Sequence, residues 1–136
     1  MPFECNAQQI VEVYLGSQDC MLFAQDAEFR FMSHVEPLRG REAIDAILRI
    51  FFREAFSKAR VEVCNMVVGK QGTVVVEFMF QGMHTGLLMG AQPTGNRVAV
   101  PMIAVFEVEQ EEIKRARLYY DTHILSRQVG LAPFEY

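Results

Sequence analysis

The feature that most restricts the fold is a long stretch of strand-like sequence, from Thr73 to Met89. A straight strand of this length would extend more than about 50 Å, at roughly 3.3 Å per residue. A compact chain of 136 residues has a diameter of only about 35–40 Å. The strand must therefore bend, and Gly82 is the expected bend because glycine tolerates the backbone of a β-bulge.

Other strand-like segments flank this one and are separated from it by turn sequences. The turn at 69–72 joins two of them, and Gln110-Glu111-Glu112 separates two more, as expected for hairpins. Near the start of the chain, Phe29 and Phe31 alternate with charged residues, which indicates a shorter strand. The predicted strands are residues 27–32, 61–68, 73–89, 97–108 and 113–121.

Helical periodicity marks the remaining parts of the chain. Asn6 is a good N-cap for a first helix that ends at Gly16-Ser17, and Asp19 can cap a short second one. A wide apolar stripe along residues 42–59 indicates a long helix that packs on a sheet, and a last helix is predicted at 122–129. The sequence therefore predicts one α+β domain over residues 1–136, with helices on the concave side of a strongly curved antiparallel sheet. These elements would form a cone around a mostly apolar pocket.

The composition limits the kinds of molecule that this chain is expected to bind. The net charge is −4, and 51% of the residues are apolar, with 11 Phe and 8 Met. Basic residues form no cluster of the kind that binds nucleic acid, no apolar run approaches the roughly 18 residues of a membrane span, and the first 15 residues do not resemble a signal peptide. We therefore expect a cytoplasmic protein with a small hydrophobic ligand and neither nucleic-acid nor membrane partners.

Cysteine and histidine positions do not indicate a metal or cofactor. The three cysteines, Cys5, Cys20 and Cys64, are widely spaced and are expected to be reduced, buried thiols. Together with the three histidines they show no spacing typical of metal ligands. No glycine-rich phosphate-binding loop follows a strand. The prediction is a chain without metal or cofactor.

The end of the last predicted strand holds the strongest candidate for acid–base chemistry. Asp121, Tyr119 and Arg117 have the same strand parity, so their side chains should project from one face. If that face lines the pocket, Asp121 could remove and return a proton next to a carbonyl group. Asp121 also precedes the last helix, where aspartate is a favoured N-cap. Both interpretations remain open from the residues alone.

Short motifs in the second half of the chain resemble those of the SnoaL-like polyketide cyclase family, in the superfamily with the nuclear transport factor 2 fold. An upstream segment, residues 38–44, looks like the family's loop into its long helix. The carrying residues are Gly82-Met83-His84-Thr85-Gly86, Pro93-Thr94-Gly95, Arg117-Leu118-Tyr119-Tyr120-Asp121 and Gln128-Val129-Gly130. The resemblance implies a cone-shaped fold, frequent homodimers and a cavity for a hydrophobic ligand.

The resemblance also implies roles for individual residues. Cyclases of the family use an aspartate as general acid/base, and the matching position here is Asp121. His84 lies within a matched motif and is expected to orient substrate, polarise a carbonyl or shuttle a proton; the alternative is a histidine bonded to backbone. Family members often carry a histidine on the first strand, where this chain has Phe31 and Met32, and the equivalence of the later His34 is open.

Several further residues are candidates for the ligand pocket. Tyr14 could offer its phenol to a ligand oxygen, or be a core tyrosine. Phe52 and Phe80 could grip a ring, although most phenylalanines in such stripes are core residues. Glu77 interrupts an apolar strand and is expected on a solvated or dimer-facing side. Arg117 and Tyr119 are expected to support Asp121.

Three functions are compatible with these residues. The leading hypothesis is a cofactor-free lyase or isomerase of the cyclase type, acting on a small hydrophobic carbonyl compound with Asp121 and His84 as its catalytic residues. The alternative is a non-catalytic homodimer that binds a hydrophobic ligand or a protein. Epoxide hydrolysis ranks last, because it needs a second carboxylate near Arg117 and Asp121. Dimerisation is expected through the outer face of the sheet, which few helices can cover.

Overall fold

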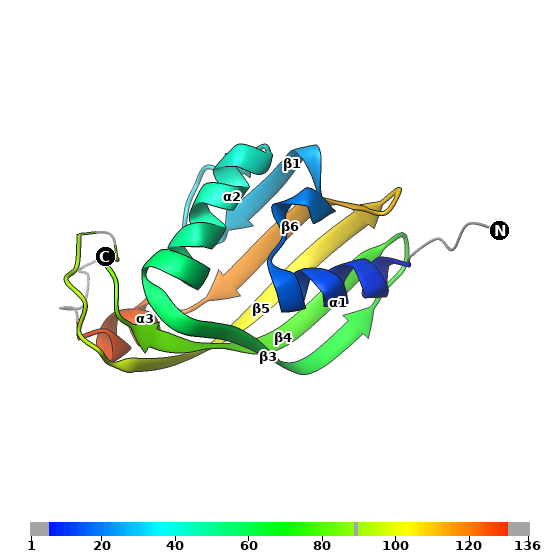
Figure 1. The fold of residues 1–136 in the computed structure, drawn as a ribbon. Helices are drawn as coiled ribbons and strands as arrows, with labels where there is room; N and C mark the ends of the chain where they lie inside the picture. The colour runs from blue at the N-terminus through cyan, green and yellow to red at the C-terminus, as the bar shows by residue number, and fades with distance from the viewer. Residues whose placement is uncertain (1–5, 89, 131–136) are drawn as a thin grey trace.

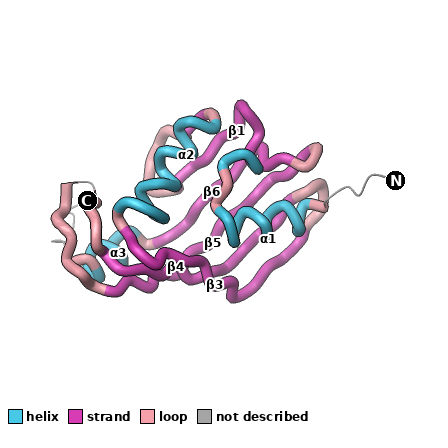
Figure 2. The backbone as a smooth tube through the Cα atoms, viewed as in Figure 1, coloured by secondary structure: helices cyan, strands magenta, loops and turns pink. Residues whose placement is uncertain are grey.

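The computed structural model describes residues 6–88 and 90–130 of the chain. Six strands form one curved sheet in the order β2-β1-β6-β5-β4-β3, and α1 and α2 lie on the same face of it (Figures 1 and 2). The strands are β1 (Phe23–Phe31), β2 (Leu38–Arg39), β3 (Phe56–Val68), β4 (Thr73–His84), β5 (Arg97–Glu109) and β6 (Glu112–Tyr120). The helical segments are α1 (Ala7–Ser17), η1 (Cys20–Leu22), α2 (Arg41–Arg49), η2 (Ile50–Glu54) and α3 (Thr122–Gln128).

The predicted α+β class is confirmed, with one difference in the sheet. Neighbouring strands are antiparallel except for β1 and β6, which run parallel with Phe29 beside Ala116. Hairpins join β3 to β4 and β5 to β6, and a tight hairpin forces two strands to be antiparallel. β1 and β6 come from opposite ends of the chain, so no short turn imposes a direction on them. The sheet is therefore mixed.

The bend near Gly82 arises in a different strand from the one predicted. β4 keeps an unbroken register with β5 through Gly82, whereas the pairing of β3 with β4 shifts between Ser57 and Arg60. A Cβ on Gly82 would lie 3.1 Å from the Cβ of Phe56, so glycine lets the bulged strand approach closely. β4 ends at His84, which shortens the strand expected to reach Met89; Met89 itself lies outside the described residues.

Alternation along the central strands builds the inner face of the sheet. In β4 and β5 the even-numbered residues are buried, while their odd-numbered neighbours are half-buried in most of β4 and exposed in most of β5. This pattern of period 2 places one side of each strand against the helices. Buried residues of this face include Val76, Phe78, Phe80, Met102, Ala104 and Phe106.

Helix α1 crosses the inner face over β3, β4, β5 and β6. Asn6 caps it as predicted, in a reciprocal pair of hydrogen bonds with Gln9. Ile10, Val11 and Tyr14 form its buried stripe, whereas Val13 is 54% exposed.

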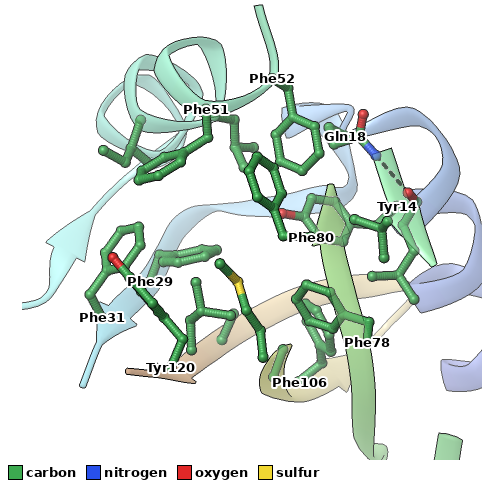
Figure 3. Close-up of a pocket in the computed structure, with 18 of the residues that line it drawn as sticks. Tyr14, Gln18, Phe29, Phe31, Phe51, Phe52, Phe78, Phe80, Phe106 and Tyr120 are labelled. Atoms are coloured by element: carbon green, nitrogen blue, oxygen red, sulfur yellow. Dashed lines mark hydrogen bonds between the residues drawn. The ribbon is translucent and has the colours of Figure 1, made fainter. Parts of the chain in front are cut away.

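The long predicted helix is shorter in the structure. α2 ends at Arg49 and continues as the π-helical turn η2, which the hydrogen bond from Ala55 N to Ile50 O closes at 2.7 Å. β3 begins at Phe56, so the last residues assigned to the helix belong to a strand. The π-turn places both Phe51 and Phe52 toward the sheet side of the helix, as Figure 3 shows.

Candidate functional site

An apolar cavity of about 60 Å³ lies between the inner face of the sheet and the layer formed by α1, α2 and η2. Phenylalanine rings form much of its wall, and Phe80 meets the rings of Phe51 and Phe52 edge to face (Figure 3). Phe51 and Phe80 have centroids 6.1 Å apart, and Phe52 and Phe80 are 5.4 Å apart. An apolar cavity of about 150 Å³ is the size that accommodates benzene. The cavity in this conformation is therefore smaller than a single aromatic ring needs.

Polar groups at the cavity are few. Among the described residues that line it, the polar side chains are those of Tyr14, Gln18, Arg117 and Tyr120, with no carboxylate and no imidazole. The Gln18 amide donates a hydrogen bond to the carbonyl of Leu15 at 2.6 Å. The phenols are therefore the main groups available to bind a ligand oxygen.

Tyr14 projects from α1 into this space. Its ring packs edge-on against Phe23 at 5.2 Å and against Phe106 at 5.6 Å. The residue is only 6% exposed, and burial raises the pKa of its hydroxyl, which keeps the phenol neutral. No described residue forms a hydrogen bond with this hydroxyl. It is therefore a neutral donor that faces the cavity without a protein partner.

Tyr120 is a second phenol at the cavity, and the sequence interpretation did not include it. Tyr120 is the last residue of β6 and pairs with Met102 in β5. Its ring lies edge-on to that of Phe31, with the ring centroids 6.4 Å apart. Burial raises the pKa of its hydroxyl as well. The sequence contained the signal for Tyr120, because Ala116, Leu118 and Tyr120 alternate with polar residues along β6.

Asp121 lies outside the cavity. It is exposed, and its Oδ1 accepts a hydrogen bond from the backbone N of His123 at 2.9 Å. This contact makes it the N-cap of α3, the structural interpretation that the sequence left open. It borders an open groove on the outer face of the sheet, beside Tyr119 and Glu77.

The expectation that Arg117, Tyr119 and Asp121 all line the pocket holds only for Arg117; β6 ends at Tyr120, and Tyr119 and Asp121 border the outer groove. Tyr119 is 40% exposed and pairs with Ile103 on the outer face. Arg117 borders the cavity, yet its guanidinium donates to the carboxylate of Glu107 at 2.8 Å. The register of β5 with β6 shifts between Glu107 and Val108, and a shift of one residue exchanges the faces of a strand.

A carboxylate on the outer face anchors Arg117. Hydrogen bonds from Arg115 and Arg117 lower the pKa of Glu107. The Nε of Arg115 and the Nη1 of Arg117 both contact Oε2 of this residue, at 3.0 and 2.8 Å. The Asp-Arg-Asp arrangement considered for epoxide hydrolysis has no counterpart among the described residues of the cavity.

His84 is fully buried but does not line the cavity. Its Nδ1 lies 3.0 Å from the hydroxyl of Thr94 and accepts a hydrogen bond from the backbone N of Thr94 at 3.3 Å. The Nε2 has no partner in the described part of the chain. His84 packs against Phe56, with ring centroids 5.7 Å apart, and it is not close to Asp121 in any contact that the structure shows.

The motif residues around His84 tie together the end of the sheet and α3. Asn96 donates to the carbonyl of Gln128 at 3.0 Å, and the side chain of Gln128 both accepts from and donates to the backbone of Ala99, at 2.6 and 2.9 Å. The Thr94 hydroxyl connects this region to His84. Residues of the family motifs thus form a hydrogen-bond network that holds the strand ends, a loop and a helix in place.

Of the five predicted ligand residues, four line the cavity: Tyr14, Phe52, Phe80 and Arg117. Tyr119 does not, and neither do His34 and Glu77, the two further residues considered in the sequence. His34 is exposed beside Phe31, and Glu77 is exposed on the outer face, where it accepts a hydrogen bond from Asn65 at 3.1 Å.

The described part of the chain contains no group of three His, Cys, Asp or Glu side chains arranged to hold a metal ion. The prediction of buried thiols is wrong for Cys64, which is exposed, while Cys20 is half-buried and burial raises the pKa of its thiol. Cys5 lies outside the described residues. None of the described helices is long and apolar enough to cross a membrane.

Comparison with solved structures places this fold among known proteins. A candidate SnoaL-like polyketide cyclase from Jannaschia sp. CCS1 is 21% identical, with a TM-score of 0.84 over 98% of this chain and 97% of that one. A protein with a ketosteroid isomerase-like fold from Catenulispora acidiphila, in complex with trimethylamine, is 23% identical, with a TM-score of 0.71 over 91% and 94%. A phenazine biosynthesis-related protein from Pseudomonas aeruginosa is 16% identical, with a TM-score of 0.75 over 96% and 88%.

These likenesses concern the fold, because identities of this size do not carry activity. No curated protein matches the chain. A sequence model of the SnoaL-like polyketide cyclase family, however, matches residues 20–129. This range is well over half of the chain, and it contains the first three motifs and the first two residues of the fourth. The chain therefore belongs to the SnoaL-like polyketide cyclase family.

Proposed function

We propose that this protein binds a neutral, hydrophobic, ring-containing carbonyl compound in the cavity, with the Tyr14 hydroxyl donating a hydrogen bond to the carbonyl oxygen. The observation that carries the proposal is the phenol of Tyr14, which forms no hydrogen bond with any described residue and lies in a mostly aromatic and aliphatic wall. A carbonyl ligand would supply the hydrogen-bond acceptor that this phenol lacks within the described part of the chain. A charged ligand would lose its hydration without an opposite charge to replace it.

Phe52 is the wall residue that we propose to move when the ligand enters. Its ring is half-buried and, among the described residues, contacts one other aromatic ring, that of Phe80. The neighbouring Phe51 is only 7% exposed and packs on Phe31, Phe56 and Phe80. Phe52 also sits on a π-helical turn, a geometry that often occurs at functional sites. Rotation of this ring toward solvent would enlarge the small cavity.

Family membership supports a second candidate, cyclase- or isomerase-type turnover of the same ligand. A hydrogen bond from Tyr14 would polarise the carbonyl and acidify the neighbouring carbon. Asp121 would take that proton and return it to another carbon, so that no atom is gained or lost, with His84 as auxiliary group. The exposed cap position of Asp121 and the absence of a carboxylate among the described cavity residues favour binding over this proton transfer.

A matched pair of probes tests the binding proposal. 1-Tetralone and tetralin share a bicyclic carbon skeleton and differ in the carbonyl group. Isothermal titration with the wild type and Tyr14→Phe should show about fivefold weaker binding of 1-tetralone by the variant, the effect of about one net hydrogen bond, and equal binding of tetralin. Equal loss for both probes, or no loss for either, would remove Tyr14 from the role proposed.

The catalytic candidate has a separate test. Solvent deuterium incorporation next to the carbonyl of 1-tetralone, followed by mass spectrometry, reports proton abstraction. If Asp121 is the base, Asp121→Asn should abolish exchange catalysed by the protein. Exchange that continues undiminished in this variant would exclude Asp121 as the base while leaving the binding proposal intact.

We also propose that a second copy of the chain covers the outer face of the sheet. Ile103 and Tyr119 are both 40% exposed there, next to Met79 and Pro101. A groove with Lys58, Arg60 and Arg97 lies at one end of this face, and Glu77 lies beyond Met79 toward the other. A twofold interface must be self-complementary, and opposite charges at the two ends meet that condition.

Sedimentation velocity at micromolar concentration tests the dimer. We expect a species of twice 15.5 kDa for the wild type and a monomer for Ile103→Glu. Val35→Glu is the matched control, because Val35 is 89% exposed in a loop. A monomeric wild type would contradict the proposal.

A further inference from the structure

We infer that Tyr120 is a second ligand-binding residue of the cavity, and that the ligand is a neutral ring compound with hydrogen-bond acceptors at both ends. The inference rests on the proposed function, which supplies the first acceptor at Tyr14. It adds a residue and a chemical requirement that Tyr14 alone does not give. The second acceptor is an ether, carbonyl or hydroxyl oxygen that faces Tyr120.

The position of Tyr120 supports this role. Its side chain lies on the inner face of β6, where the residue opposite it in β5 is Met102 and the nearest aromatic ring is that of Phe31. Neither neighbour accepts a hydrogen bond strongly, and no described residue forms one with the Tyr120 hydroxyl. The ring is held by packing while the hydroxyl has no protein partner. The same description applies to Tyr14.

The two phenols lie at opposite sides of the cavity (Figure 3). Tyr14 packs on Phe106, which pairs with Ala116 in β6, whereas Tyr120 is four residues further along the same strand. Four residues of strand separate the backbones of Ala116 and Tyr120 by about 13 Å. The two phenols enter the cavity from different elements, α1 and β6, so the inference assigns each of them its own oxygen atom on the ligand.

The remaining polar groups limit the charge of that ligand. The Arg117 guanidinium is engaged by Glu107 at 2.8 Å on the outer face, and the Gln18 amide nitrogen is engaged by its own helix. A carboxylate in the cavity would have no free cation to pair with among the described lining residues. Burial raises the pKa of both tyrosines, so each acts as a neutral donor. Two neutral donors fit a neutral ligand with two acceptors.

A set of three probes tests the inference: tetralin, 1-tetralone and 6-methoxy-1-tetralone, which carry no, one and two oxygen atoms on the same carbon skeleton. In the wild type, the methoxy compound should bind about fivefold more tightly than 1-tetralone, the effect of one additional net hydrogen bond. In Tyr120→Phe that difference should disappear, while the affinities for tetralin and 1-tetralone stay unchanged. The variant keeps the ring and its packing, so it should remain folded.

The possible results separate the two proposals. If the methoxy compound keeps its advantage in Tyr120→Phe, or if this variant weakens all three probes equally, Tyr120 only packs and the inference is overturned. If Tyr14→Phe does not weaken 1-tetralone, the proposed function fails, whatever Tyr120 does. If the wild type binds none of the probes, both are overturned. Tyr119→Phe, on the outer face, is the control and should change none of the three affinities.

Discussion

Replacing Tyr14 by phenylalanine should stabilise the ligand-free protein. The residue is 6% exposed and its hydroxyl has no partner among the described residues. A fully buried polar group left unpaired costs about 1–3 kcal/mol, and the hydroxyl of Tyr14 is not itself fully buried. The cavity of about 60 Å³ has room for water beside the hydroxyl, which places the expected gain at the lower end, about 1 kcal/mol. The ring contacts with Phe23 and Phe106 survive the change.

Urea denaturation measures this gain in the free energy of unfolding. Wild type and variant should show the same slope of that free energy against urea concentration, because an unchanged slope means that unfolding exposes the same surface. The melting temperature should rise by roughly 4 °C for a domain of this size. Tyr119→Phe is the control, since Tyr119 is 40% exposed and its change should stay within about 0.5 kcal/mol. A Tyr14→Phe protein less stable than the wild type would mean that the hydroxyl is already bonded inside the protein. It would then not be free for a ligand.

Three further changes test other parts of the structure. Phe52→Ala should raise the association rate constant of 1-tetralone in stopped-flow measurements by roughly tenfold, since binding would no longer wait for a ring to move; an unchanged rate would exclude Phe52 as the moving wall. Gly86→Ala should cost about 3 kcal/mol in urea denaturation, because its Cβ would collide with the Glu54 carbonyl oxygen, whereas Gly16→Ala meets open space and should not destabilise. Glu107→Gln should lower stability near neutral pH, and its difference from wild type should shrink as the pH falls through the lowered pKa of Glu107. A difference that does not change between pH 7 and pH 3 would refute that assignment.

Local signals were the most reliable guide to the fold. Asn6 and Asp19 were recognised as helix caps because a cap depends on a few neighbouring residues, and both form the expected hydrogen bonds. The hairpin turns near 69–72 and 110–112 follow the same logic, since turn residues act on their own backbone. The structure has turns in both places.

Longer-range features were less accessible. The predicted helix reached residue 59, but the structure has a strand from Phe56. An apolar residue at every third or fourth position fits a helix, whereas in the folded protein these residues pair with β4 as a strand. Such pairing is a tertiary effect that a local pattern does not contain. The parallel pairing of β1 with β6 could not be predicted either, because the two strands come from opposite ends of the chain.

The site shows the same division between local and distant information. Asp121 was correctly seen as a possible cap, but the face of β6 was assigned from the family motif rather than from the apolar parity of Ala116, Leu118 and Tyr120. The register shift beside Val108 prevents parity from being carried over from the preceding strand. Only the apolar residues of β6 itself could have indicated which of its sides is buried.

Membership of the family and choice of ligand come from different parts of this chain. The motif residues His84 and Thr94 hydrogen-bond to each other, and Gln128 hydrogen-bonds to Asn96 and Ala99 at the α3 end of the sheet, where these contacts hold the fold. Tyr14 lies outside the matched range of 20–129, and its phenol projects into the cavity. A family match can therefore persist while the ligand changes, since replacing a cavity phenol leaves the network around His84 intact. For this protein, substrate class must be sought from the cavity phenols rather than from the motifs by which the family is recognised.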